Sequence, residues 1–222
     1  MDFKQLLNQV LASGGDLANQ ASTTVEARTA GMSDRTRGAI GGAVGGSLLT
    51  MLLGSKKGRK LGKKAAKLGG TAALGVLAYK VYNDWQAGKQ GTPGVAAPLP
   101  VAAAPPDTPQ HSMAVLRAML AAAKADGHVD DAERGRIFKA VQSIGATPEV
   151  SAFVEAELAR PLDPAYVAAG LGGPEEAAEI YLASVLMVDE QSFMERAYLE
   201  ELARELKLTP DLVARLEAQV AG

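Results

Sequence analysis

The residues of this chain that are best suited to chemistry are carboxylates in two short stretches. The first stretch holds Asp126, Asp130 and Glu133, and the second holds Asp189 and Glu195. A hard divalent cation such as Ca²⁺ or Mg²⁺ needs several carboxylate oxygens brought together. The two stretches therefore predict a shared site for a divalent cation, the one cofactor the sequence indicates, or for a cationic partner.

The same residues also fit a purely structural role. The spacings Asp130-x-x-Glu133 and Ser192-x-x-Glu195 match capping boxes, in which side chains hydrogen-bond to the free amides at a helix start. Capping and cation binding both stay open at this point.

A calcium EF-hand is disfavoured. Gly127 and Glu133 match the second half of an EF-hand loop, but Ala122 and Lys124 stand where the first half needs acids. His128 is expected to be an exposed loop residue.

No motif for catalysis is present. The chain has no cysteine and two histidines, and it lacks a GxSxG elbow, an HExxH pair and a phosphate-binding glycine loop followed by Lys-Ser/Thr. We therefore expect that the protein is not an enzyme.

The acidic stretches must be positioned by helices. From residue 113 to 222 helix signals dominate and no strand pattern is found. Gly145 ends one predicted helix. Four pairs then match a cap residue followed by proline at the first helical position: Thr147-Pro148, Asp163-Pro164, Gly173-Pro174 and Thr209-Pro210. The fold class is predicted to be all-α.

This helical region contains an internal repeat. Residues 133–156 align without gaps on residues 195–218, at an offset of 62 positions, and both segments contain the pairs Glu-Arg and Thr-Pro at matching places. The alignment predicts a bundle made of two related helical hairpins.

The chain begins with a short amphipathic pattern. Phe3, Leu6, Leu7, Val10 and Leu11 fall on one face of a helix. Two interpretations are open: the helix docks on another protein surface, or it lies on a membrane.

A glycine-rich run could cross a membrane. Residues 38–55 form 18 positions without a charge, which span about 27 Å as a helix against a bilayer core of ~30 Å. Gly38, Gly42 and Gly46 recur every fourth residue, a spacing that lets two helices pack closely. Self-association or packing on a second segment is expected there. The alternative is a soluble glycine-rich loop.

A cationic block follows this run. It places seven positive charges in twelve residues, and anionic lipid headgroups are the expected contact. Nucleic acid is not expected, because only 5% of the residues are aromatic. Trp85, with Tyr79 and Tyr82, is predicted to lie at the membrane interface. These lipid-contacting residues are Lys56, Lys57, Arg59, Lys60, Lys63, Lys64, Lys67 and Trp85.

The membrane topology depends on how many segments of the chain span the bilayer. A single span, favoured because residues 68–79 are short for a second one, places the C-terminal half in the cytoplasm with the cationic block. Two spans would place it on the far side.

Three regions are therefore predicted. Residues 1–86 form the membrane-associated region, residues 87–112 hold six prolines and form a tether, and residues 113–222 form the helical domain. Residues 1–90 carry 13 basic against 5 acidic residues, a net charge of +8, whereas residues 91–222 carry 10 against 20, a net charge of −10. The two halves are expected to meet different partners.

Four segments of the chain resemble the YebE family of bacterial inner-membrane proteins of unknown function. They are LLGSKKGRKLG (52–62), LAYKVYNDWQ (77–86), KADGHVDDAER (124–134) and FMERAYLEELARELKL (193–208). The resemblance implies a location in a bacterial inner membrane and a C-terminal helical domain related to the tellurite-resistance TerB-like domains. It also implies acidic loops that bind metal, with Asp126, Asp130, Glu133, Asp189 and Glu195 at the matching places. It implies no established activity.

Two functions of different class follow. The first is a membrane-tethered, non-enzymatic helical adaptor that displays an acidic TerB-like domain to protein partners, in envelope or metal stress. The second is a soluble sensor of divalent cations whose Gly/Lys-rich region binds nucleic acid or a protein.

Overall fold

The chain folds as an assembly of helices. The computed structural model describes residues 2–8, 71–89, 108–125, 135, 137–138, 141–142, 145–188 and 193–220. Within these residues it contains helices and no strand, so the all-α prediction is confirmed. The helices are α4 (Thr71–Lys89), α5 (Pro109–Ala123), α7 (Pro148–Ala159), α8 (Pro164–Ala168), α9 (Pro174–Met187), α10 (Phe193–Glu205) and α11 (Pro210–Ala218).

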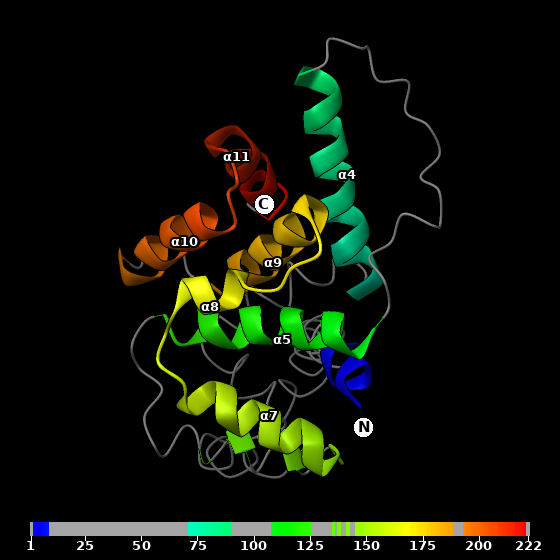
Figure 1. Cartoon of the computed structure of the whole chain (residues 1–222), viewed down its shortest axis with the longest axis vertical. Coiled ribbons are helices and arrows are strands. Elements are labelled where there is room, and N and C mark those ends of the chain that lie inside the picture. Colours follow the sequence, from blue (N-terminus) through cyan, green and yellow to red (C-terminus); the bar gives the residue numbers. More distant parts are fainter. Residues whose placement is uncertain are drawn as a thin grey trace, which may run out of the picture.

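Helix α9 lies at the centre of the bundle (Figure 1). Every residue from Ala177 to Met187 is buried, and α9 contacts α4, α5, α10 and α11. A helix that is apolar on nearly all sides must be surrounded by other elements. The arrangement of the neighbouring helices follows from this requirement.

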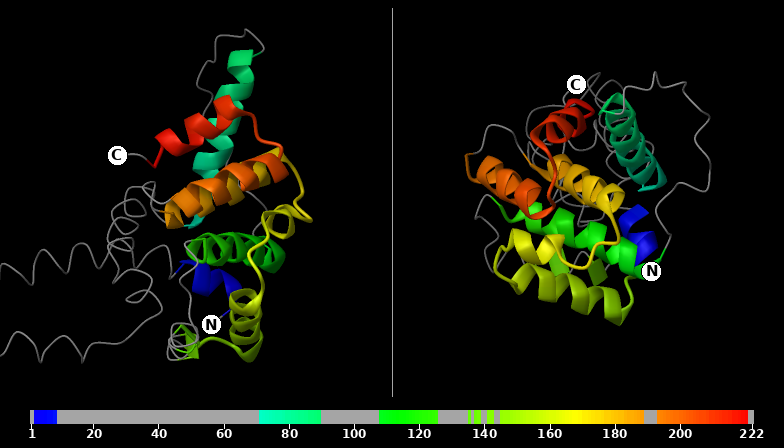
Figure 2. Two further views of the ribbon diagram at one scale, coloured as in Figure 1. Left: turned by 90° about the vertical axis from the view of Figure 1, so that its left-hand side faces the viewer. Right: turned by 45° about the horizontal axis from the view of Figure 1, so that its top comes forward.

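The outer helices complete two sides of the bundle. Helix α7 packs on α5, while α8 bridges α5 and α10. In the turned views α11 lies beside α4, and α7 lies on the opposite side of α5 from α9 (Figure 2).

Proline pairs set the helix starts. All four pairs predicted from the sequence begin helices, with proline in the first turn of α7, α8, α9 and α11. The Thr147 and Asp163 side chains accept hydrogen bonds from backbone amides of α7 and α8. A fifth pair, Thr108-Pro109, begins α5 in the same way inside the stretch that was predicted to be linker.

Helix α4 belongs to the same core as the C-terminal helices. Its buried side chains Leu74, Ala78, Val81 and Tyr82 join the hydrophobic cluster formed with α9. The segment between α4 and α5 therefore connects two helices of one bundle, and does not hold a separate domain at a distance. Sequence composition missed this because a proline-rich connection looks the same whether or not its ends meet.

No described helix, α4 included, is both long and apolar enough to cross a bilayer. The glycine-rich run of residues 38–55 lies outside the described residues.

The N-terminal helical segment, residues 3–8, docks on protein. Phe3, Leu6 and Leu7 are buried in the core cluster, and the Phe3 ring meets the Phe153 ring of α7 edge-on at 5.3 Å. Asp2 caps the segment: its carboxylate accepts from the Gln5 amide, and the Gln5 side chain accepts from the Asp2 amide. The docking interpretation is confirmed for these residues, whose apolar face is not available to a membrane.

We predict that the packing of α4 on α9 contributes to global stability. Leu74 is 1% exposed, so Leu74→Ala should lower the free energy of unfolding by about 2–5 kcal/mol. Lys80→Ala, on the exposed side of the same helix, is the matched control and should change it by less than about 0.5 kcal/mol. Urea unfolding followed by circular dichroism measures both. Equal effects would contradict the packing of α4 in the core.

A second stability prediction concerns the end of α10. Lys207 has a φ of 56° and occupies the left-handed position of a Schellman turn, because the Leu208 amide donates to the Ala203 carbonyl and the Lys207 amide to that of Arg204. An L-residue pays roughly 1–2 kcal/mol for this conformation. Lys207→Gly should therefore raise the melting temperature, whereas Lys207→Ala, which keeps the strain, should not. A rise with both variants would assign the effect to the lysine side chain.

Candidate functional site

The predicted acidic site falls mostly outside the described residues. Asp126, Asp130, Glu133 and Asp189 belong to segments that the structure does not describe. Glu195 is fully buried in the first turn of α10 and interacts with other groups of the chain. Its position fits a capping carboxylate. The described residues contain no His/Asp/Glu cluster arranged for a metal ion, and the cation site in the loops stays a prediction.

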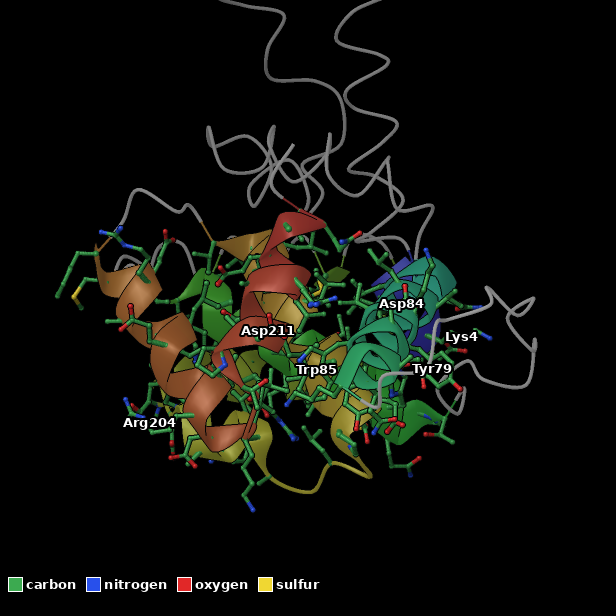
Figure 3. All side chains as sticks on the ribbon, turned by 90° about the horizontal axis from the view of Figure 1, so that it is seen from above. Lys4, Tyr79, Asp84, Trp85, Arg204 and Asp211 are labelled. Atoms are coloured by element: carbon green, nitrogen blue, oxygen red, sulfur yellow. The ribbon has the colours of Figure 1, made fainter. Side chains whose placement is uncertain are left out.

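The predicted lipid and helix-packing residues are likewise outside the described part of the chain, with one exception. Residues 38–67, which include the three glycines and the cationic block, are not described. Trp85 is described, and it differs from the prediction. Its ring packs against the core cluster and the Tyr82 ring, 5.7 Å away. Figure 3 shows Trp85 on the side of α4 that faces α11, between α4 and Asp211.

Lys124 explains why the EF-hand pattern is incomplete. Its ammonium group donates to the backbone carbonyl oxygens of Glu157 and Arg160 at the end of α7. These carbonyls have no partner inside the helix, and a cation there is favourable. Burial lowers the pKa of Lys124. The negative charge of Glu157 opposes this shift in part, and the positive charge of Arg160 adds to it. The lysine therefore has a structural role where a calcium loop needs an acid.

A buried carboxylate next to Lys124 ties three helices together. Glu157 of α7 accepts from the Tyr166 hydroxyl at 2.8 Å and from Arg117 Nε at 3.3 Å. The guanidinium groups of Arg117 and Arg160 lie 4.6 and 4.1 Å from the centre of the Tyr166 ring. The polar groups of this cluster are paired with one another. The cluster therefore has a structural role and holds α5, α7 and α8 together.

His111 lies between two acids of α9. Its Nδ1 is 3.5 Å from Glu176 Oε1 and its Nε2 is 3.3 Å from Glu179 Oε1. The hydrogen bond to Glu179 and the charges of both acids raise the pKa of His111 above its usual value, against the opposing effect of burial. The acids contact opposite ring nitrogens, so one metal ion could not be ligated by both acids and a single nitrogen. The group is a charged contact between the starts of α5 and α9.

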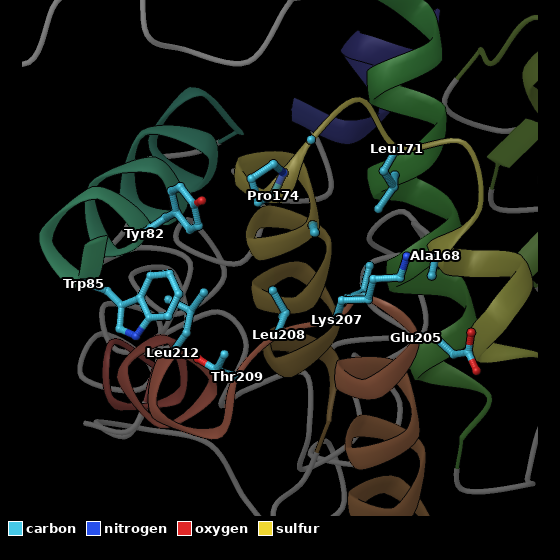
Figure 4. A pocket seen from close by; sticks show the side chains of 13 residues that line it. Tyr82, Trp85, Ala168, Leu171, Pro174, Glu205, Lys207, Leu208, Thr209 and Leu212 are labelled. Atoms are coloured by element: carbon cyan, nitrogen blue, oxygen red, sulfur yellow. The ribbon is translucent and has the colours of Figure 1, made fainter. Parts of the chain in front are cut away.

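A pocket lies between α4, α9 and the α10–α11 turn (Figure 4). Its volume is about 460 Å³, within the range of small-molecule sites. Side chains from three separate parts of the chain form its walls, most of them apolar. The principal ones are Tyr82 and Trp85 from α4, Leu171 and Pro174 before and in α9, and Lys207, Leu208, Thr209 and Leu212 around the α10–α11 turn.

Two side chains that line this pocket each carry a buried polar atom without a hydrogen-bond partner among the described residues. The two atoms are Trp85 Nε1 and Thr209 Oγ1. Thr209 begins α11 with the same Thr-Pro pair as Thr147 begins α7, yet its hydroxyl makes no capping bond. An unpaired buried polar group costs about 1–3 kcal/mol. Both atoms are shielded from solvent, so they lie behind the wall of the pocket and not on its surface.

Sequence reasoning did not find this pocket. Its residues come from positions 82–85, 168–177 and 205–212, and no spacing rule connects them. The one local signal is the aromatic pair Tyr82 and Trp85, for which the sequence alone predicts a membrane interface because amphipathic rings suit both environments.

Comparison with known proteins identifies the family. A family model described as protein of unknown function (DUF533) matches residues 38–220. The chain belongs to this family. An uncharacterized protein in the ampR 5′ region of Yersinia enterocolitica is 32% identical over 111 residues, which cover 50% of this chain and 80% of the relative. No solved structure matches the chain. The DUF533 match covers α4, the pocket and the C-terminal helices.

For this DUF533 protein we predict a stability that depends on the charge of His111. Because the folded pKa lies above 6.5, the ordinary value, protonated His111 stabilises the fold fully below pH 6.5, and this contribution is lost as the pH rises through the folded pKa. The free energy of unfolding of the wild type should therefore exceed that of His111→Gln most at low pH, and the two should converge above the folded pKa. Urea titrations across this range measure it. A difference that is independent of pH would show that the histidine acts through packing alone.

Proposed function

We propose that the protein is a membrane-tethered, non-enzymatic adaptor that displays an acidic, TerB-like helical domain to protein partners. Residues 38–55 would insert in a bacterial inner membrane, and the cationic block of residues 56–67 would contact anionic lipid on the cytoplasmic side. The helical domain, with two related hairpins, would then be cytoplasmic. Gly38, Gly42 and Gly46 would provide a contact for self-association or for packing on another segment of the chain.

The packing of α4 on α9 is the observation that carries this proposal. Helix α4 begins at Thr71, shortly after the last lysine of the block, Lys67, and its buried face is part of the bundle core. A bilayer contact made by the block would therefore hold the whole bundle close to the membrane. The bundle would not hang from a long tether.

The charges support the same arrangement. An anionic membrane attracts the region with a net charge of +8 and repels the region with a net charge of −10. Exposed acids such as Glu149, Glu155 and Glu200 would then face away from the lipid. This orientation leaves the acidic surface free for a basic partner in the cytoplasm.

Vesicle binding of the full chain tests the tether. We expect the protein to float with phosphatidylcholine vesicles that contain phosphatidylglycerol and to resist extraction with carbonate. Replacing Lys60, Lys63 and Lys64 with Gln should reduce the preference for anionic over neutral vesicles by about 1 kcal/mol per charge, or about 100-fold in all. Replacing three bundle cations, Arg204, Lys207 and Arg215, is the matched control and should leave binding unchanged.

Two results would contradict the adaptor proposal. The first is recovery of the intact chain in the soluble fraction without detergent. The second is an equal loss of vesicle binding in both triple variants, which would mean that net charge alone, and not the block beside α4, determines the contact.

A further inference from the structure

Helix α10 lies at the edge of the bundle and covers the core with one side only (Figure 1). That side contacts α5, α8 and α9 and buries Tyr198, Leu199 and Leu202. The helix begins with Phe193 and Met194, which are 75% and 59% exposed and are the two most exposed large apolar side chains among the described residues. One exposed apolar residue is ordinary, but two adjacent ones at the start of a solvent-exposed helix side indicate a contact surface.

The exposed side of α10 has the residue spacing with which one helix packs on another. Phe193, Ala197, Glu200 and Arg204 are all exposed and are separated by four, three and four positions. Residues with this spacing form one line along a helix, which we call the α10 stripe. The stripe is about 17 Å long, so a contact along it buries less than a standard interface of about 1,600 Å². Association through the stripe is therefore weak and reversible.

The charges of the α10 stripe match those of a second α10 that runs in the opposite direction. A twofold axis at the middle of the stripe places Phe193 opposite Arg204 of the second copy, and Ala197 opposite Glu200. A guanidinium group over an aromatic ring is a favourable contact, and the small Ala197 lets the two helices approach closely. A parallel pair would instead place Glu200 against Glu200 and Arg204 against Arg204, and like charges disfavour that arrangement.

Arg196 adds an ion pair to the antiparallel arrangement. It precedes Glu200 by one helical turn on the same flank of α10, and a twofold axis brings the same flanks of two helices together. Arg196 of each copy therefore lies next to Glu200 of the other. Among the described residues neither of them is held in an ion pair, whereas Arg204 pairs with Glu201 of its own helix.

We propose that the protein self-associates as a twofold dimer in which α10 packs antiparallel on α10 of a second copy. The partner is a second copy because this face is complementary in charge to itself. The dimer uses Glu200, whereas Glu149 and Glu155 of α7 stay exposed for a basic partner. This surface is independent of the membrane tether and of the glycine contact proposed above.

A single thiol tests the contact, because the chain has no cysteine. Ala197→Cys places one thiol on each copy beside the twofold axis, where the two are close enough for a disulfide. Ala214→Cys, at an exposed position of α11, is the matched control. Both full-length variants, in detergent micelles or in buffer if no detergent is needed, are oxidised with copper phenanthroline and followed by non-reducing electrophoresis.

We expect the Ala197→Cys chain to form a disulfide dimer at least about tenfold faster than the Ala214→Cys chain, because thiols held together react at a raised effective concentration. Equal rates would overturn the proposed interface. Phe193→Ala in the Ala197→Cys chain should slow this reaction, whereas Leu162→Ala, which removes an exposed apolar side chain outside α10, should not. An unaltered rate with Phe193→Ala would overturn the position of the stripe.

Charge reversal tests the antiparallel register. In the Ala197→Cys chain, Arg196→Glu and Glu200→Arg each place like charges across the axis, so each should slow its own cross-linking about tenfold, which corresponds to about 1.4 kcal/mol. When the two variants are co-expressed with different tags, opposite charges meet at both contacts, and the mixed dimer should cross-link as fast as the unreversed chain. Arg215→Glu and Asp211→Arg, at exposed positions of α11, are the matched controls and should have no effect.

Two outcomes of the charge reversal would contradict the proposal. If the mixed dimer fails to recover while circular dichroism shows intact helices, the antiparallel register is wrong. If the α11 controls slow cross-linking as much as the α10 variants, net charge determines the association and the α10 contact does not exist.

Discussion

The burial of α9 is the constraint on which the rest of this structure depends. An unbroken run from Ala177 to Met187 is removed from solvent, and a helix of this kind is stable only when other helices cover all its sides. Helices α4, α5, α10 and α11 provide that cover. The N-terminal and C-terminal parts of the chain, which differ so strongly in charge, are thus joined by apolar contacts that salt does not weaken.

The burial of α9 from Ala177 onward also means that its polar side chains need partners. Glu179 is 3% exposed, and a carboxylate in that position must be paired or it would lose its charge. His111 reaches it from the start of α5, and Ser184 satisfies its own hydroxyl by donating to the Ile180 carbonyl oxygen. Tyr181, next along the helix, donates to Glu217 of α11 at 2.7 Å. These contacts link α9 to its neighbours or to its own backbone, whereas the second carboxylate oxygen of Glu179, Oε2, is buried without a hydrogen-bond partner among the described residues.

The pocket forms where that cover is incomplete. At the start of α9, helix α4 and the α10–α11 turn approach from two sides without closing on each other. The turn has its shape because Lys207 adopts a left-handed conformation that lets the chain reverse before Thr209. Thr209, which begins α11, then has its hydroxyl buried without a partner among the described residues. The pocket is thus a consequence of how α11 is attached to α10.

The sequence by itself determined the features that depend on a few neighbouring residues. The Thr147-Pro148 and Thr209-Pro210 pairs predicted helix starts correctly, because a proline lacks the amide that the first turn leaves free. Gly145 predicted a helix end correctly, since its φ of 74° suits glycine. The all-α class followed from such signals and from the apolar periodicity.

Only the tertiary structure decided what the helices bury. Tyr82 and Trp85 have rings with a polar edge, which suit a membrane interface and a protein core equally well. They pack in the protein core here because α4 packs against α9 and α11. The pocket joins residues that are more than a hundred positions apart, Trp85 and Thr209 among them. Local patterns carry no information about such pairs, because their contact depends on how whole helices pack.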